Sequence, residues 1–152
     1  MTISRRRALL AAGAAVVCFS SGTVRAEDDS LARLLGLIGQ RLDVMPDVAK
    51  HKFNTGAAVD DLPREAQVLA QVTAQAAAAG VAPDLAERFF QAQIDAAKTI
   101  QRARIAAWKA QGRGPFADAP DLAKDIRPKL DGLTPLLIAA LRDAAPALAQ
   151  PD

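Results

Sequence analysis

The fold of this chain is decided by residues 83–108, PDLAERFFQAQIDAAKTIQRARIAAW. Pro83 and Asp84 are residue types that favour the first turn of a helix. The residues that follow form a stripe that advances by three or four positions at each step: Phe90, Ile94, Ala97, Gln101, Ile105 and Trp108. This spacing predicts one long amphipathic helix that ends near Gly112 and Gly114.

Two more helices are predicted before this segment. Apolar residues recur at three and four over residues 30–53, which indicates an amphipathic helix with a kink at Pro46. After a loop that contains Gly56, Asp60 or Asp61 is expected to cap a helix over residues 62–79.

The C-terminal part is predicted to form shorter helices. Residues 112–120 are a loop rich in Gly, Pro and Ala, and a short helix is expected over residues 121–129. Thr134 and Pro135 are typical of a cap and first turn, so a last helix should run from there to about Leu148. No segment alternates at period two, so we expect an all-α fold, a single-domain helical bundle of three main helices plus short C-terminal helices.

The composition excludes several classes of site. The chain has 152 residues, of which 51% are hydrophobic and 4% aromatic, with no Tyr. Its single histidine is His51 and its single cysteine is Cys18. These counts argue against zinc sites of the usual kind, iron–sulfur ligation, disulfide frameworks and histidine-based triads. Metal chemistry would therefore need carboxylates alone, and we expect no metal site.

Residues 1–26 have the pattern of a cleaved signal peptide. Three arginines, Arg5–Arg7, precede an apolar stretch over residues 8–19, which is too short for a membrane anchor. The segment suits either the general or the twin-arginine export route. Cys18 follows Val17, a poor match to a lipoprotein signal, so we expect cleavage after Ala26. Residues 27–152 would then be a soluble domain, periplasmic or secreted.

The net charge changes when this leader is removed. The whole chain has 19 basic and 17 acidic residues, but the leader holds four arginines and no acid. The mature domain therefore has fifteen basic and seventeen acidic residues, a formal charge of −2. The basic isoelectric point of the precursor is thus no argument for binding nucleic acid or anionic membranes.

Two cations fall on the apolar face of the helix over residues 30–53. Arg41 and Lys52 are eleven residues apart, so at about 100° per residue both point the same way. A buried cation is costly unless an anion meets it, which indicates a site for an acidic ligand. Alternatively, both side chains extend from the edge of the stripe into water.

Three more polar residues fit such a site. Gln101 interrupts the apolar stripe of the long helix, where either a ligand or a neighbouring helix would have to satisfy its amide. Arg64 lies in the first turn of its helix, where a cation opposes the helix dipole. Arg127 is held between Ile126 and Pro128, although a solvated loop arginine would look the same. With Arg41 and Lys52, this set suits a small dicarboxylate.

These residues resemble those of a known family, the secreted all-helical chorismate mutases, which form the exported gamma subclass of the AroQ class. The resemblance covers nearly all of the mature chain. Its matching stretches are residues 37–44, 48–53, 61–65, 89–101 and 126–130. Most specific is the spacing of Arg41, Lys52 and Arg64, supported by Gln101 on the long helix.

The resemblance implies a Claisen rearrangement of chorismate to prephenate without cofactor or covalent intermediate. Arg41 and Arg127 resemble the clamps for the substrate's carboxylates, and Lys52 and Gln101 the pair that reaches its ether oxygen. Arg64 and Glu65 match positions beside the substrate ring, where Glu65 would meet the ring hydroxyl. Members of this family generally pair as homodimers. Ala97 departs from the pattern, because relatives often have a hydroxyl or another polar group there.

A non-enzymatic function is the alternative. A periplasmic helical bundle could carry haem, but Met45 and His51 lie too close on one helix to bind both faces of a haem. The stronger rival is an exported helical interaction or stress protein that holds partner helices in an apolar groove. Such a protein would expose apolar surface and would not depend on Arg41 or Lys52.

Overall fold

The computed structural model describes residues 21–149, so most of the predicted signal peptide lies outside the described residues. Within this range the chain folds into helices without a strand. They are α1 (Ser21–Asp43), α2 (Met45–Thr55), α3 (Leu62–Ala78), α4 (Pro83–Ala110), a π-helical turn η1 (Leu122–Ile126) and α5 (Arg127–Leu148). The predicted all-α bundle is confirmed.

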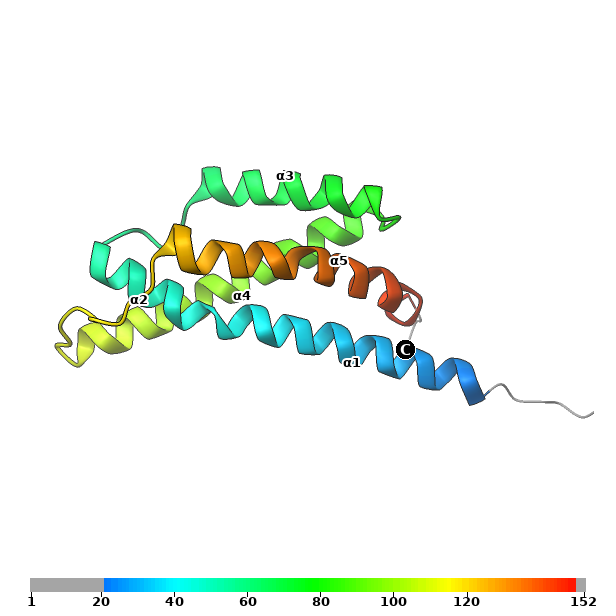
Figure 1. Cartoon of the computed structure of the whole chain (residues 1–152), viewed down its shortest axis with the longest axis horizontal. Coiled ribbons are helices and arrows are strands. Elements are labelled where there is room, and N and C mark those ends of the chain that lie inside the picture. Colours follow the sequence, from blue (N-terminus) through cyan, green and yellow to red (C-terminus); the bar gives the residue numbers. More distant parts are fainter. Residues whose placement is uncertain (1–20, 150–152) are drawn as a thin grey trace, which may run out of the picture.

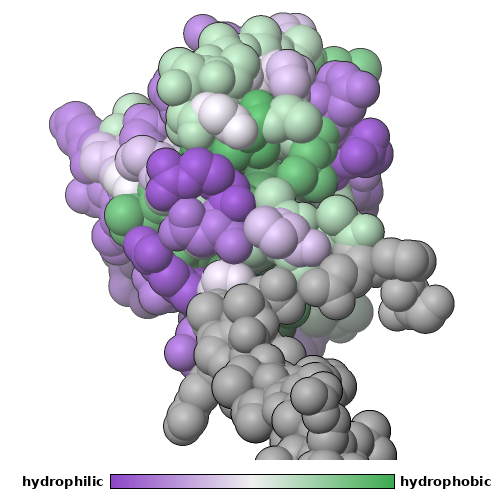
Figure 2. Space-filling model, turned by 90° about the vertical axis from the view of Figure 1, so that its right-hand side faces the viewer, coloured by the Kyte–Doolittle hydropathy of each residue, from purple (hydrophilic) through white to green (hydrophobic). Residues whose placement is uncertain are grey.

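The helices run along one long axis (Figure 1). The helices α1 and α4 run toward one end of the bundle, and α3 and α5 return. The C-terminal helix α5 packs along α1, while α4 packs against both α2 and α3. At the end where α3 passes into α4, hydrophobic surface gathers between hydrophilic flanks (Figure 2).

The kink predicted at Pro46 divides the first long helix in two. Val44 keeps right-handed helical backbone angles between α1 and α2, so the chain bends there without unwinding. Proline has no N–H and its ring crowds the preceding turn, which is the usual cause of such a bend. The bend directs α2 toward α4.

The starts and ends of the next helices follow the predicted signals. Asp61 caps α3, because its Oδ1 accepts from the backbone N–H of Arg64 at 3.2 Å. In return Oε1 of Glu65 accepts from the Asp61 N–H at 3.3 Å. Gly80, with φ of +78°, follows α3 in a left-handed conformation that is strained for residues with a side chain.

The prediction was wrong at the C-terminal end, where α5 is one 22-residue helix rather than two short ones. It passes through Pro135, which normally costs about 3 kcal/mol inside a helix. The completely buried Leu137 and Leu141 follow this position and belong to the main core, which also holds residues of α1, α3 and α4. Burial of these side chains offsets the cost of the proline and keeps the helix continuous.

Two apolar clusters fill the bundle. The larger lies between α1, α3, α4 and α5 and includes Leu34, Val72, Phe90 and Leu141. The smaller joins α1, α2, α4 and η1 and is built around Met45, Val48, Ala97 and Ile126. The smaller cluster forms the floor of the site described below.

A buried amide on α4, Gln93, gives a prediction about stability. Its side chain is 7% exposed and its Oε1 has no hydrogen-bond partner. An unsatisfied buried acceptor costs on the order of 1–3 kcal/mol, so Gln93→Leu should raise the free energy of unfolding by about 1 kcal/mol. Urea unfolding followed by circular dichroism measures this change.

The matched control is Gln91→Leu, two residues earlier, where the amide bonds to Asp95 near the surface. This control should leave stability within about 0.5 kcal/mol of the wild type. A loss of stability in Gln93→Leu, with none in the control, would mean that the Gln93 amide is satisfied in solution.

Candidate active site

One pocket of about 200 Å³ lies where α1, α2, α3, α4 and the start of α5 meet. We call it the central pocket. It is lined by Arg41, Met45, Val48, Lys52, Val59, Asp61, Arg64, Glu65, Val68, Ile94, Ala97, Lys98, Gln101, Leu122, Arg127, Leu130, Asp131 and Thr134. All six residues that the sequence proposed for a site are among them. The fold therefore gathers side chains that are up to 86 positions apart in the chain.

Arg41 is the most deeply placed cation of the pocket. It lies in the last turn of α1 and is only 8% exposed, so it does not extend into water as the alternative required. Its Nε is buried without a hydrogen-bond partner. Burial lowers the pKa of Arg41, and the more distant charge of Asp131 opposes this only in part. An arginine held in this way favours an anion that enters the pocket.

Lys52 approaches the same space from α2. Its Nζ donates to the carbonyl of Val59 at 2.9 Å, which leaves further N–H groups of the ammonium for a ligand. Burial lowers the pKa of Lys52, and the nearby carboxylates of Asp61, Glu65 and Asp60 counteract that effect. The kink at Pro46 thus leaves both cations on the pocket side of the bent helix, as their spacing predicted.

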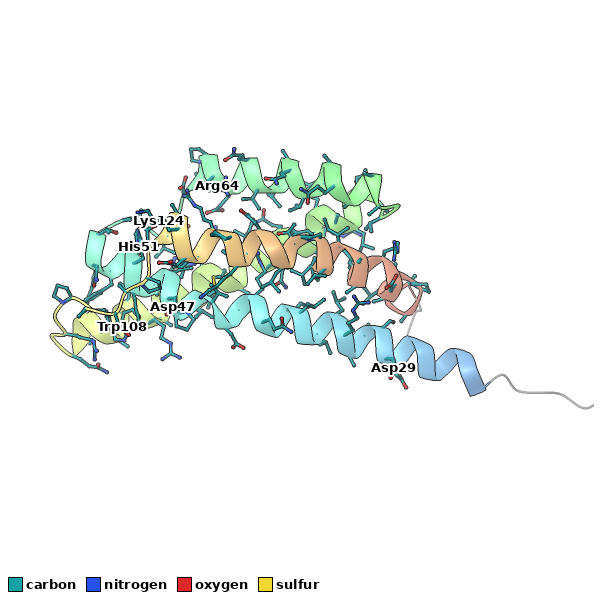
Figure 3. The ribbon with its side chains drawn as sticks, in the orientation of Figure 1. Asp29, Asp47, His51, Arg64, Trp108 and Lys124 are labelled. Atoms are coloured by element: carbon teal, nitrogen blue, oxygen red, sulfur yellow. The ribbon has the colours of Figure 1, made fainter. Side chains whose placement is uncertain are left out.

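The first turn of α3 contributes Arg64 and Glu65. Arg64 stands at the start of α3, above the beginning of α5 (Figure 3). Its Nη1 donates to Oε1 of Gln67 at 2.7 Å, one turn along the same helix. Glu65 is paired with Lys98 of α4, whose Nζ lies 2.8 Å from Oε2. The charge of Glu65 is therefore anchored across two helices.

Lys98 is a lining residue that the sequence analysis missed. It follows Ile94 by four positions and precedes Gln101 by three, so the same periodicity places it on the pocket side of α4. The pKa of Lys98 is raised, first of all by the hydrogen bond to Glu65.

Gln101 lies in the wall formed by α4 and is 5% exposed. Its Nε2 makes only a long contact, 3.6 Å, to the sulfur of Met45, and its Oε1 has no partner. Neighbouring helices therefore leave the Oε1 of this amide unsatisfied and give its Nε2 only a weak sulfur acceptor, so they satisfy it in part. An amide in this position is free to turn either end toward a ligand.

Arg127 enters from the start of α5, directly after the π-helical turn. Asp121 caps that turn by accepting from the N–H groups of Ala123 and Lys124 at 2.8 Å each. Ile126, which is completely buried, anchors the residue before Arg127 in the smaller cluster. Arg127 itself is exposed and lines the open side of the pocket.

The pocket thus combines three arginines, two lysines, three carboxylates and an amide with an apolar floor. Among residues 21–149, no three His, Cys, Asp or Glu side chains come together as metal ligands would. None of the described helices is long and apolar enough to cross a membrane.

Comparison with known proteins points to one family. Residues 27–102 match the family model of chorismate mutase type II. A secreted chorismate mutase of Mycolicibacterium smegmatis is 34% identical over 146 residues, which are 94% of this chain and 80% of that protein. A monofunctional chorismate mutase of Enterobacter agglomerans is 35% identical over 64% of this chain, but this match spans only 50% of that protein.

Solved structures give the same result. The chorismate mutase of Burkholderia thailandensis superposes with a TM-score of 0.78 and is 45% identical, with 82% of this chain and 78% of that chain covered. The chorismate mutase of Burkholderia phymatum gives a TM-score of 0.75 at 35% identity, covering 80% of this chain and 74% of that chain. The chain described here belongs to the chorismate mutase type II family.

Proposed function

We propose that this protein is a chorismate mutase that converts chorismate to prephenate in the central pocket. The observation that carries the proposal is Arg41, a buried arginine whose Nε has no hydrogen-bond partner, facing the same cavity as Lys52 and Gln101. Chorismate is a small dicarboxylate, and two carboxylates would complete this arrangement. The alternative, a protein that holds partner helices in an apolar groove, would not require charged side chains at the centre of the site.

The reaction needs orientation more than it needs a reactive group. Within chorismate one C–O bond of the ether breaks while one C–C bond forms, and no proton is transferred in that step. Holding the enolpyruvyl arm over the ring removes rotational freedom before the barrier is reached. In our proposal Arg41 and Arg127 bind the two carboxylates and impose this conformation.

Negative charge grows on the ether oxygen as its bond to carbon lengthens. We assign Lys52 and Gln101 as its donors, because the two side chains line the same pocket from α2 and α4. Both side chains already line the pocket, and donors aimed at the oxygen stabilise a transition state more than a ground state that carries less charge. Binding chorismate would require Nε2 of Gln101 to leave its long contact with Met45.

In our proposal the first turn of α3 contacts the ring side of the substrate. Arg64 and Glu65 line the pocket there, and Glu65 is held by Lys98 and by the N–H of Asp61. Each carboxylate oxygen has two lone pairs, so Glu65 retains acceptor capacity for the ring hydroxyl. We include Lys98 in the proposed site as the residue that fixes Glu65.

Export is the second part of the proposal. The relatives from Mycolicibacterium smegmatis and Mycobacterium tuberculosis are named secreted chorismate mutases. The family match begins at residue 27, which supports 27–152 as the mature domain. Assembly as a homodimer is also proposed, supported by the exposed Leu35 and Leu136 on the neighbouring helices α1 and α5. Sedimentation equilibrium of residues 27–152 measures that state.

Cleavage of the leader gives a direct prediction. Protein recovered from the periplasm should begin at Glu27, because Val24-Arg25-Ala26 supplies the cleavage site after the apolar stretch. Intact-mass spectrometry of that fraction distinguishes this terminus from the alternatives. An uncleaved N-terminus, or a lipid attached to Cys18, would contradict a soluble exported enzyme.

The buried arginine gives the second prediction. Residues 27–152 should consume chorismate, and Arg41→Met should lower turnover by about 10²-fold or more, the usual effect of removing one fixed donor. The thermal midpoint of Arg41→Met should hold or rise, because an uncompensated buried charge is removed. Loss of the chorismate absorbance and a thermal melt measure both effects.

The matched control is Arg33→Met, on the exposed face of the same helix, where the arginine lies 3.7 Å from Asp143. It should keep wild-type turnover. Equal activity of Arg41→Met and the control would remove Arg41 from the site, and no turnover by the wild type would overturn the proposed reaction.

Gln101→Glu gives a prediction about pH. A neutral amide donates at every pH, whereas a glutamic acid donates only while it is protonated. Once ionised, the new carboxylate would oppose the charge that develops on the ether oxygen. The activity of Gln101→Glu should therefore be highest in acid and fall as pH rises through the pKa of the new side chain.

Gln101→Leu serves as the comparison and should be slow at all pH values. Steady-state rates from acid to alkaline pH, with circular dichroism at each pH, measure the two profiles. A Gln101→Glu profile parallel to the wild type would show that Gln101 does not donate to the reacting oxygen.

A further inference from the structure

One side-chain amide of α2 binds the backbone of the connection between α4 and η1. Asn54 stands in the last turn of α2, and its Nδ2 donates to the carbonyl of Phe116 at 2.8 Å. The N–H of Phe116 donates back to Oδ1 of Asn54, also at 2.8 Å. A single side chain thus engages both backbone polar groups of one loop residue.

Packing reinforces the same point of attachment. Phe116 is the one buried residue between positions 111 and 121, at 9% exposure. Its ring packs edge to face with Phe53 at 5.8 Å and with Trp108 at 4.5 Å between centroids. The guanidinium of Arg113 lies 4.1 Å from its centroid. The loop is therefore fixed at Phe116, although most of it is exposed.

Further contacts hold the loop toward its C-terminal end. Lys50 pairs with Asp118 at 2.8 Å, and Nδ1 of His51 lies 3.3 Å from the carbonyl of Pro120. With Asn54, these residues lie on one side of α2, at positions i, i+1 and i+4. Lys52 is two positions before Asn54, about 200° around the helix, and lines the central pocket instead.

The path from this attachment to Arg127 is short and well held. Asp121 starts the π-helical turn, Ile126 is buried beside Met45 and Val48, and Arg127 follows at once. The same helix that presents Lys52 to the pocket therefore also fixes the segment that delivers Arg127. The position of Arg127 relative to Lys52 therefore depends on how the loop between α4 and η1 packs against α2.

We propose that Asn54 is a positioning residue that holds Arg127 in place for binding the substrate, through its two hydrogen bonds with Phe116. This inference rests on the proposed function, in which Arg127 binds a carboxylate of chorismate. Asn54 is absent from the central pocket and acts only through the loop.

The test is a double-mutant cycle in residues 27–152. Asn54→Ala should raise the KM for chorismate about fivefold to tenfold and change kcat less than twofold, because a displaced Arg127, at the exposed side of the pocket, would lose part of its contact with substrate and transition state alike. In an Arg127→Ala background the same change should alter kcat/KM less than twofold. Asn54→Asp keeps the acceptor for the Phe116 N–H and should give an intermediate KM.

Thr55→Ala is the matched control, since Thr55 Oγ1 donates only to the His51 carbonyl within α2. It should leave both constants unchanged. Circular dichroism shows whether each variant is folded. If Asn54→Ala is unfolded, Asn54→Asp replaces it in the double-mutant cycle.

Two results would overturn the inference. One is an unchanged KM in folded Asn54→Ala, and the other is an equal loss of kcat/KM with and without Arg127, which would mean that Asn54 acts elsewhere. In both cases the wild type would still convert chorismate. If the proposed function were wrong, the wild type would not convert chorismate at all.

Discussion

The site depends on a positive charge that the bundle buries and does not pair. Taking a guanidinium out of water costs several kcal/mol unless an anion or hydrogen bonds compensate. Arg41 bears this cost at the end of α1, where the buried Leu34 and Leu37 fix the helix in the larger apolar cluster. That cluster lies toward the opposite end of the bundle from Lys52 and supplies the stability that an unfavourable charge requires. An anionic ligand that pairs with Arg41 would compensate this cost, which gives a functional reason for the buried charge.

The charges around the pocket divide into paired and unpaired groups. At the rim, Arg102 holds Asp60 with contacts of 2.6 and 2.7 Å, and Lys98 holds Glu65. The exposed pair of Arg102 and Asp60 stabilises the fold little. The half-buried pair of Lys98 and Glu65 fixes two side chains that line the cavity. Inside, Arg41 and Gln101 retain unpaired atoms. Because the surroundings are already fixed, a ligand would meet oriented donors rather than having to organise them.

The C-terminal third shows where local sequence signals mislead. Thr134 and Pro135 have the pattern of a helix start, yet they lie inside α5, where Oγ1 of Thr134 donates to the carbonyl of Leu130 at 3.0 Å. Whether a proline begins a helix or lies inside one depends on whether burial of the neighbouring side chains offsets its cost. That burial is a property of the tertiary structure. Lys98 was missed for a related reason, because its partner Glu65 is 33 positions away.

The sequence by itself determined the helical class, the bend at Pro46 and the shared face of Arg41 and Lys52, because these follow from local geometry with a period of 3.6 residues. It also singled out Gln101, since a polar residue on an apolar stripe is visible without coordinates. Only the tertiary structure decided that Arg41 is unpaired, that Lys98 fixes Glu65 and that Asn54 seats the loop before Arg127. Burial and pairing arise between helices distant in sequence, and no local pattern encodes those distances.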